Sequence, residues 1–161
     1  MITAELLLEA FERNWGIIQA QTKGLSHEQC LLQPPFRGNC MNWVLGHIAD
    51  TRNDVLKALN EEPIMSPEES ARYGYGSEPV CADGQDVIPL ERLLGMMRQS
   101  QERMGVVLSR MSAADFQRMV QGHRHLITLG NRLFDLYFHE TYHVGQTELL
   151  RQLAGTDDKV I

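Results

Sequence analysis

The chain has 161 residues and a formal net charge of −6, which is the size of one globular domain and a charge that disfavours nucleic-acid binding. Hydrophobic residues make up 43% of it, and no apolar run approaches the roughly 18 residues that cross a bilayer. We therefore expect a single domain over residues 1–161, with no membrane partner and a cytoplasmic location.

Two amphipathic helices are predicted in the first 60 residues. Apolar residues recur at steps of three and four along residues 3–23, with Thr3 placed as a helix cap and Gly24 as a stop. The second predicted helix covers residues 42–60, with Asn42 as its cap. The three cysteines are too few and too far apart for a disulfide framework or a cysteine-built zinc knuckle, so any metal must have other ligands.

Two further helices are predicted in the second half of the chain. One begins at Pro89 and carries inward-facing apolar residues as far as Met111, and the other runs from about Leu129 to Leu153 and is ended by Gly155. No segment shows sustained alternation of apolar and polar residues. Four long helices without a sheet predict an all-α fold, a four-helix bundle.

The connection at residues 61–88 is far longer than the 2 to 8 residues that usually join antiparallel neighbours in a bundle. A long crossover is expected there, and it makes the second and third helices parallel. Such a segment can also cover a site, and Tyr73 and Tyr75 are candidates for a lid over a substrate. The alternative is that both tyrosines only cover the end of the bundle.

Histidines suggest a metal site. His139 and His143 are four residues apart on the last predicted helix, so both imidazoles point the same way. His47 lies on an inward-facing position of the second helix and is the best third ligand. The alternative is that these are interior histidines bonded to the backbone or to carboxylates. The other histidines stand in expected turns or loops, where we expect them to be solvated: His27, His123 and His125.

The segment from His139 to His143 also satisfies the His-Glu-x-x-His pattern of zinc proteases, in which the Glu is the general base. The extended pattern needs a glycine where Gln146 stands and a histidine where Leu149 stands. An all-helical chain also lacks the sheet edge along which a protease holds an extended peptide. We therefore disfavour a peptidase.

Two segments resemble a known family, the DinB/YfiT-like four-helix bundles. Asn42-Trp43-Val44-Leu45-Gly46-His47-Ile48-Ala49-Asp50 is similar to the first-ligand segment of that family, and His139-Glu140-Thr141-Tyr142-His143-Val144-Gly145-Gln146 is similar to its two-ligand segment. The resemblance covers nearly the whole chain. It implies an up-down-down-up bundle with a long crossover between the second and third helices, and one divalent ion (Zn, Ni, Fe or Mn) held by His47, His139 and His143.

The resemblance also implies a small-molecule substrate and a homodimer, because family members include thiol-dependent transferases and isomerases and commonly pair. An open cation on three imidazoles favours thiol-dependent S-transferase or isomerase chemistry with a low-molecular-weight thiol. A hydrolase that uses metal-bound water, or a non-catalytic metal-binding or association module, are the alternatives. Asp50 and Gln146 are placed to accept an imidazole N–H or to orient water; Glu140 serves either in that way or, as we favour, as a structural surface charge.

Overall fold

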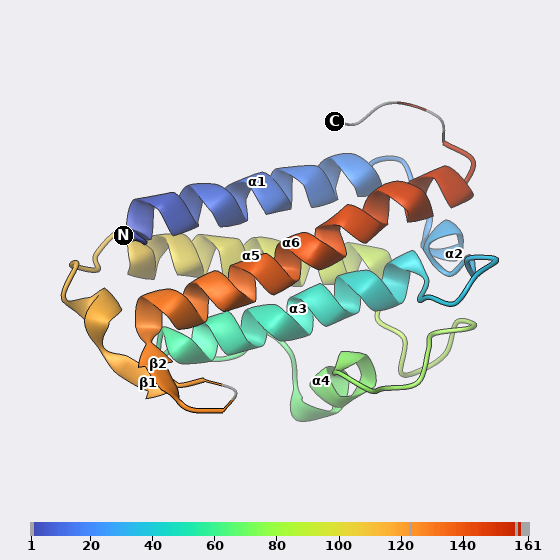
Figure 1. The fold of residues 1–161 in the computed structure, drawn as a ribbon. Coiled ribbons are helices and arrows are strands. Elements are labelled where there is room, and N and C mark those ends of the chain that lie inside the picture. Colours follow the sequence, from blue (N-terminus) through green and yellow to red (C-terminus); the bar gives the residue numbers. More distant parts are fainter. Residues whose placement is uncertain (1, 123, 157, 159–161) are drawn as a thin grey trace.

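Four long helices form most of the molecule in the computed structural model, which describes residues 2–122, 124–156 and 158 (Figure 1). The long helices are α1 (Ala4–Thr22), α3 (Met41–Ala58), α5 (Leu90–Leu108) and α6 (Leu129–Leu153). Between them stand the short helices α2 (His27–Cys30) and α4 (Pro67–Tyr73), the 3-10 turn η1 (Asp115–Gln117) and the strands β1 (Met119–Gln121) and β2 (Leu126–Thr128). Across the described residues, the fold is all-α apart from this one pair of strands.

The helices α1 and α6 run in one direction, and α3 and α5 run in the other (Figure 1). Contacts between the helices follow these directions. Between α1 and α6 the residue numbers rise together, in the pairs Asn14–Thr141 and Gln21–Glu148. They also rise together at the boundary of α3 and α5, in the pairs Asn42–Ile88 and Arg52–Met97. Between α3 and α6 the residue numbers of one helix rise as those of the other fall, in the pairs His47–His143 and Thr51–His139.

Most of the predicted helix ends are confirmed. The Thr3 side chain accepts a hydrogen bond from a backbone N–H of the first turn of α1, at 3.2 Å. Gly24 and Gly155 follow the ends of α1 and α6 with φ values of 77° and 87°, in the left-handed region that glycine adopts without strain. These ends could be read from the sequence because a helix cap involves only neighbouring residues.

The prediction that Asn42 caps the second helix is wrong. α3 already begins at Met41, and Cys40 is its N-cap residue, without a side-chain hydrogen bond. Asn42 is buried inside the helix, where its amide group donates to the backbone oxygen of Ile88 at 2.8 Å. A partner 46 residues away therefore overrides the local preference of Asn for a cap.

The crossover segment, residues 61–88, leads from the end of α3 back to the start of α5. It contains α4, which the sequence did not predict, and this helix begins with Ser66 and Glu69 in a reciprocal capping box. The segment is tied to α3 by Asn53, whose side-chain oxygen accepts from the backbone N–H of Ile64 at 2.8 Å and of Met65 at 3.2 Å. The crossover is thus a packed part of the bundle.

The expectation of a chain without any sheet is also wrong, because β1 and β2 form an antiparallel hairpin before α6. Each strand has three residues, and Val120 faces Ile127 at its centre. Three residues are too few to show the alternation that reveals a strand in a sequence. The hairpin lies at the end of the bundle and leaves the four-helix core unchanged (Figure 1).

The long helices bury their apolar sides in two adjoining clusters. Members of the first include Leu45, Ile48, Leu93 and Met97, and members of the second include Phe11, Leu56, Met104 and Leu133. Each such side chain contributes about 1.5–3 kcal/mol on burial, so the bundle has a substantial apolar core of its own. In the described part of the chain, no helix combines the length and the apolar character that a membrane crossing requires.

Candidate metal centre

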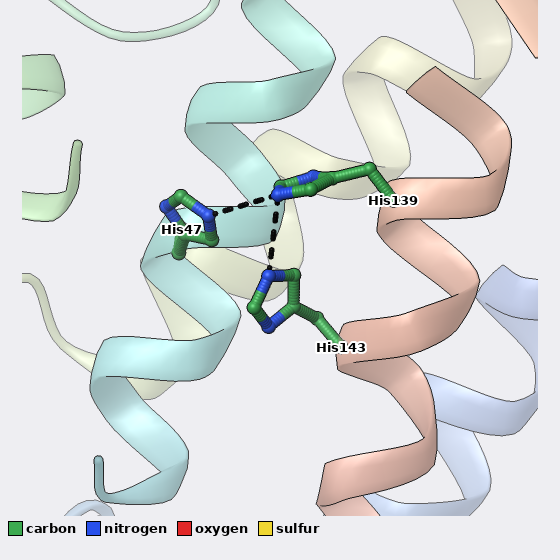
Figure 2. A group of neighbouring side chains, drawn as sticks. All are labelled: His47, His139 and His143. Carbon is green, nitrogen blue, oxygen red and sulfur yellow. Dashed lines mark hydrogen bonds between the residues drawn. The ribbon is translucent and has the colours of Figure 1, made fainter. Parts of the chain in front are cut away.

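Three histidine side chains converge between α3 and α6 (Figure 2). His47 on α3 is buried, whereas His139 and His143, one turn apart on α6, are half-buried. The Nε2 atom of His139 lies 3.4 Å from Nε2 of His47 and 3.3 Å from Nε2 of His143. The structure therefore brings together the three histidines that the sequence singles out.

The spacing of these nitrogens fits a metal ion. Two imidazole nitrogens that each lie about 2.0–2.1 Å from a tetrahedral zinc ion are about 3.3–3.4 Å apart. The two Nε2 separations from His139 have these values, and ligand atoms of all three rings lie within 4.8 Å of one another. Three neutral nitrogen ligands suit zinc, nickel or iron, and they leave further coordination positions for a substrate.

The far nitrogens of two rings are held by oxygen atoms that only accept. His47 Nδ1 lies 2.8 Å from the backbone oxygen of Tyr73, and His143 Nδ1 lies 2.8 Å from Oε1 of Gln146. Each Nδ1 must therefore carry the proton and donate it, because a carbonyl oxygen has none to give. In a neutral ring this leaves Nε2 unprotonated, with its lone pair directed at the centre of the cluster.

Thr51 holds the third ring in the same way. Its hydroxyl donates to the backbone oxygen of His47 at 3.0 Å, and its oxygen lies 3.2 Å from Nδ1 of His139. Because the hydroxyl proton is already used, Thr51 accepts from His139, and Nε2 of this ring is unprotonated too. The three Nε2 atoms then face one another, as the ligands of a single metal ion would.

The pKa of His143 favours the same neutral form. Burial lowers this pKa below its ordinary value of 6.5, and the nearby His47 adds to the shift, although the hydrogen bond with Gln146 opposes it. A lowered pKa means that the ring gives up its second proton more readily. His143 is therefore neutral, and able to bind a metal, down to a lower pH than an exposed histidine.

The sequence did not identify Thr51 and Trp43 as parts of this site. The Trp43 indole stacks on the His47 imidazole, with 4.8 Å between ring centroids and 17° between the planes. Its N–H donates to the hydroxyl of Ser77 in the crossover segment at 3.0 Å. Both residues are four positions from His47 on one helix, and this spacing is the signal that could have revealed them.

A cleft of about 520 Å³ opens beside the cluster. Its volume is in the range of small-molecule sites. It is lined by side chains of α3 and α6 and by one residue of the crossover segment: His47, Asp50, Thr51, Asp54, Tyr75, Arg132, Asp135, Leu136 and His139. Among these, Arg132 pairs with Asp54 at 3.5 Å. The three-histidine cluster thus borders a space that a small molecule can enter.

Asp50 lies on α3 one turn after His47 and lines the cleft. It does not bind the His47 ring, since that N–H is taken by the Tyr73 carbonyl. Burial raises the pKa of the Asp50 carboxyl, and a hydrogen bond with Ser70 opposes the shift. Asp50 therefore does not accept the imidazole N–H of His47, but its place beside the cleft permits the other expected role, that of orienting water. Gln146 has the expected contact with a ligand ring.

The two tyrosines expected in a lid have different positions. Tyr73 is completely buried, and its hydroxyl donates to the Asn42 side chain and accepts from the Ile88 backbone, so the expectation that it closes over a substrate is wrong. The reason is that this ring fills the interior of the bundle. Tyr75, only two residues later, is 99% exposed and lines the cleft.

Glu140 is not the surface charge that we favoured. Its side chain is completely buried and forms a bidentate pair with Arg52, with both nitrogen–oxygen distances at 2.9 Å. The rotation between adjacent helix residues turns it away from the histidine cluster and into the core. A carboxylate held in this pair is unavailable as a general base, which adds a structural reason to disfavour a zinc peptidase.

The remaining histidines stand apart from the cluster. His27 lies at the start of α2 and contacts Asp83 at 3.2 Å, and His125 is exposed in the hairpin. Position 123 lies outside the described residues, so the expectation for His123 stays a prediction. Among the described residues, the only group of three or more possible metal ligands is the cluster of His47, His139 and His143.

Comparison with known proteins identifies the family of this chain and a solved structure with a similar fold. The family model described as the DinB superfamily matches residues 10–147. A crystal structure of a conserved protein from Enterococcus faecalis is similar, with a TM-score of 0.74 and 15% sequence identity over 97% of this chain and 99% of that one. At this identity the likeness concerns the fold alone. No curated protein matches this chain significantly.

Proposed function

Because the chain belongs to the DinB superfamily, we propose that it is a metal-dependent enzyme that joins a small thiol to an electrophilic small molecule. One observation carries the proposal: three imidazole Nε2 atoms converge at the edge of a cleft of about 520 Å³. A site built only to hold the bundle together needs no such opening, because structural metal sites are closed by protein ligands.

His47, His139 and His143 would hold one divalent ion through Nε2. When bound, such an ion acts as a Lewis acid that lowers the pKa of a thiol or a water molecule beside it. The protein supports this by orienting the three rings through Tyr73, Thr51 and Gln146, whose oxygen atoms contact the three Nδ1 atoms. Because none of the three ligands is charged, the positive charge of the ion is available to the substrate.

Asp50 is the side chain proposed to accept the proton of the thiol. It lines the same cleft as His47, and burial raises the pKa of its carboxyl, which makes it a stronger base than an exposed aspartate. In the proposed reaction the sulfur loses its proton to Asp50 and forms a bond to an electrophilic carbon. The leaving group of the electrophile departs with the electrons of the broken bond, so the reaction needs no oxidant.

The walls of the cleft favour a substrate that carries a positive charge. Within the described chain, no ion pair joins Asp50 or Asp135 to a basic side chain, whereas the one arginine of the cleft is already paired with Asp54. The exposed ring of Tyr75 adds an aromatic face, which attracts cations. We therefore propose an aminothiol, or an electrophile with an ammonium group, as the substrate class.

Metal content is the first test. Protein purified without a histidine tag should contain close to one equivalent of divalent metal by elemental analysis. The variant His143→Ala should lose it, and His125→Ala, which removes an exposed histidine outside the cluster, should keep it. Full retention of metal by His143→Ala would overturn the site.

Turnover is the second test. Metal-loaded protein is mixed with an alkyl halide electrophile and either cysteamine or 2-mercaptoethanol, which differ by an amine in place of a hydroxyl, with metal-free protein as the control. We expect metal-dependent consumption of thiol that is faster with cysteamine, and a smaller preference for it in Asp135→Asn. If neither thiol reacts faster with the loaded protein, the thiol chemistry is wrong. Metal-dependent cleavage of ester substrates without thiol would instead support a hydrolase, in which Asp50 takes a proton from water.

The homodimer expected from the family resemblance stays a proposal. The side of α6 opposite the core carries exposed aromatic rings at Phe134, Phe138 and Tyr142, at 44%, 65% and 65% exposure. An apolar surface of this kind often binds another protein. Sedimentation of the wild type at micromolar concentration tests the dimer, and Phe138→Glu should lower the mass to that of the monomer if this surface is the interface.

A further inference from the structure

The crossover segment contacts α3 directly around His47. Tyr73 is the last residue of α4, and the chain becomes extended at Gly74, with φ −69° and ψ 167°. A helix that ends in this way leaves its last carbonyl groups without helical partners. The Tyr73 carbonyl is the group that accepts from Nδ1 of His47 at 2.8 Å. The orientation of a predicted metal ligand therefore depends on where α4 ends.

The side chain of Tyr73 fixes that end of α4. Its hydroxyl donates to Oδ1 of Asn42 at 3.0 Å and accepts from the backbone N–H of Ile88 at 2.8 Å. The Asn42 amide closes a ring of hydrogen bonds by donating to the Ile88 carbonyl at 2.8 Å. All three groups are buried, so an unmade bond in this ring would leave a polar atom without water or partner.

Gly46, the residue before His47, provides the space for the Tyr73 ring. A Cβ atom at Gly46 would overlap the Cγ, Cδ1 and Cε1 atoms of this ring. The ring is confined by its buried surroundings and cannot move aside as the end of a flexible side chain can. Glycine usually weakens the middle of a helix, so its presence here has a packing reason.

We propose that Gly46 and Tyr73 are positioning residues for the metal centre, because the ring seated on Gly46 places the Tyr73 carbonyl that keeps His47 in its metal-binding tautomer. This proposal depends on the proposed function only for the metal. The tautomer itself is a property of the metal-free protein and can be measured there.

The decisive variant is Gly46→Ala, with Gly95→Ala as the matched control. Gly95 also lies inside a long helix, but a Cβ atom there meets nothing within 4 Å. Both variants gain the same helix propensity, so a difference between them reports the overlap with Tyr73. In Gly46→Ala we expect zinc affinity to fall 10- to 100-fold, in line with the loss of a hydrogen bond to a ligand, and Gly95→Ala should bind like the wild type.

The imidazole nitrogens of His47 provide the second measurement. Long-range ¹H–¹⁵N spectra of metal-free protein should show Nδ1 protonated and Nε2 unprotonated in the wild type and in Gly95→Ala. In Gly46→Ala we expect a mixture of both tautomers. Should wild-type protein bind no metal while its spectrum shows the expected tautomer, the proposed function would be wrong but the positioning role would stand.

Tyr73→Phe keeps the proposal testable if Gly46→Ala does not fold. This variant retains the ring on Gly46 but removes both hydrogen bonds of the hydroxyl, so the end of α4 is held less firmly. We expect a lower Tm, a 3- to 10-fold weaker zinc affinity and a partial change of the His47 tautomer. A lower Tm with unchanged affinity and tautomer, in either variant, would show that the two residues are merely structural and would overturn the proposal.

Discussion

Adjacent residues on the same two helices build two polar clusters of opposite character. Arg52 and Glu140 point into the core, where both side chains are completely buried and neutralise each other in a bidentate pair. Their neighbours Thr51 and His139 point to the other side, where three imidazoles converge with unprotonated nitrogens at the edge of a cleft. One cluster pairs two opposite charges within the protein, and the other is a group of three histidines that could hold a metal ion.

The difference separates a buried polar pair that holds the helices together from a polar group that faces a cleft. The Arg52 guanidinium also donates to the backbone oxygen of Met97 and to Ser100 on α5, so the pair joins three of the four long helices. A buried pair of this kind selects one arrangement of the helices. In the histidine cluster, by contrast, three ring nitrogens converge beside a cleft, which is the arrangement that the ligands of a metal ion adopt.

The largest effect on stability should come from breaking the ion pair. Arg52→Met leaves the Glu140 charge buried and without its partner, which we expect to lower the free energy of unfolding by about 3–5 kcal/mol. Urea unfolding in the presence of a chelator measures this loss of free energy. The double variant Arg52→Met with Glu140→Leu should recover most of the loss, because no charge then remains in the core. A single variant as stable as the wild type would contradict this view of the pair.

The next largest effect concerns the histidine cluster. His143→Ala should weaken metal binding by more than 100-fold, or about 3 kcal/mol, because it removes a ligand rather than a hydrogen bond to one. The stability of the metal-free protein should change by less than about 1 kcal/mol, since the half-buried ring contributes little to the core. Isothermal titration with zinc and urea unfolding of the same sample separate the two quantities. Equal losses in both would mean that the clusters do not differ as proposed.

A smaller effect should follow from removing a hydrogen bond to a ligand. Gln146→Leu leaves Nδ1 of His143 without its acceptor, and we expect zinc affinity to fall by about 10-fold. Gln152→Leu is the matched control, because Gln152 is also exposed on α6 and, among the described residues, its side chain bonds Glu148 alone, at 3.3 Å. Identical affinities of the two variants would exclude a role for Gln146 in orienting the ring.

The smallest effect is a pH dependence of the metal-free protein. Burial lowers the pKa of His143 in the folded state below 6.5, so the unfolded chain binds the proton more readily. This group therefore has no effect on stability well above pH 6.5 and reduces stability as the pH falls from 6.5 through the folded pKa. Unfolding of the wild type and of His143→Gln at pH 7.5 and 5.5, with chelator, should show a larger loss in the wild type. An equal loss in both would contradict the shift.

The sequence predicted the long helices and the histidine cluster because both depend on short-range periodicity. The spacing of His139 and His143 places them on one side of a helix whatever that helix packs against. The length of residues 61–88 likewise implies that α3 and α5 are parallel. The short hairpin and α4 were missed because elements this small have little pattern to recognise.

The roles of single side chains around the cluster were harder to predict. Asn42 was expected at a helix cap and Tyr73 in a lid, yet they bond each other inside the bundle at 3.0 Å. Glu140 was expected at the surface, although a charge adjacent to a ligand on a helix must point about 100° away from it. That direction leads into the core here, and only the buried Arg52 makes such a position tolerable for a carboxylate.

By itself, the sequence determined the four long helices, their order along the chain and the residues that can bind a metal, because these follow from local spacing and residue chemistry. Only the tertiary structure decided how the site is completed. His47 finds its hydrogen-bond acceptor 26 residues away, in a backbone carbonyl that every residue type possesses and no sequence pattern marks. Nothing in the sequence distinguishes Gly46 from other glycines, and only the structure shows that the Tyr73 ring packs against it. Such partners are set by how distant segments pack, and packing depends on the shapes of all of them at once.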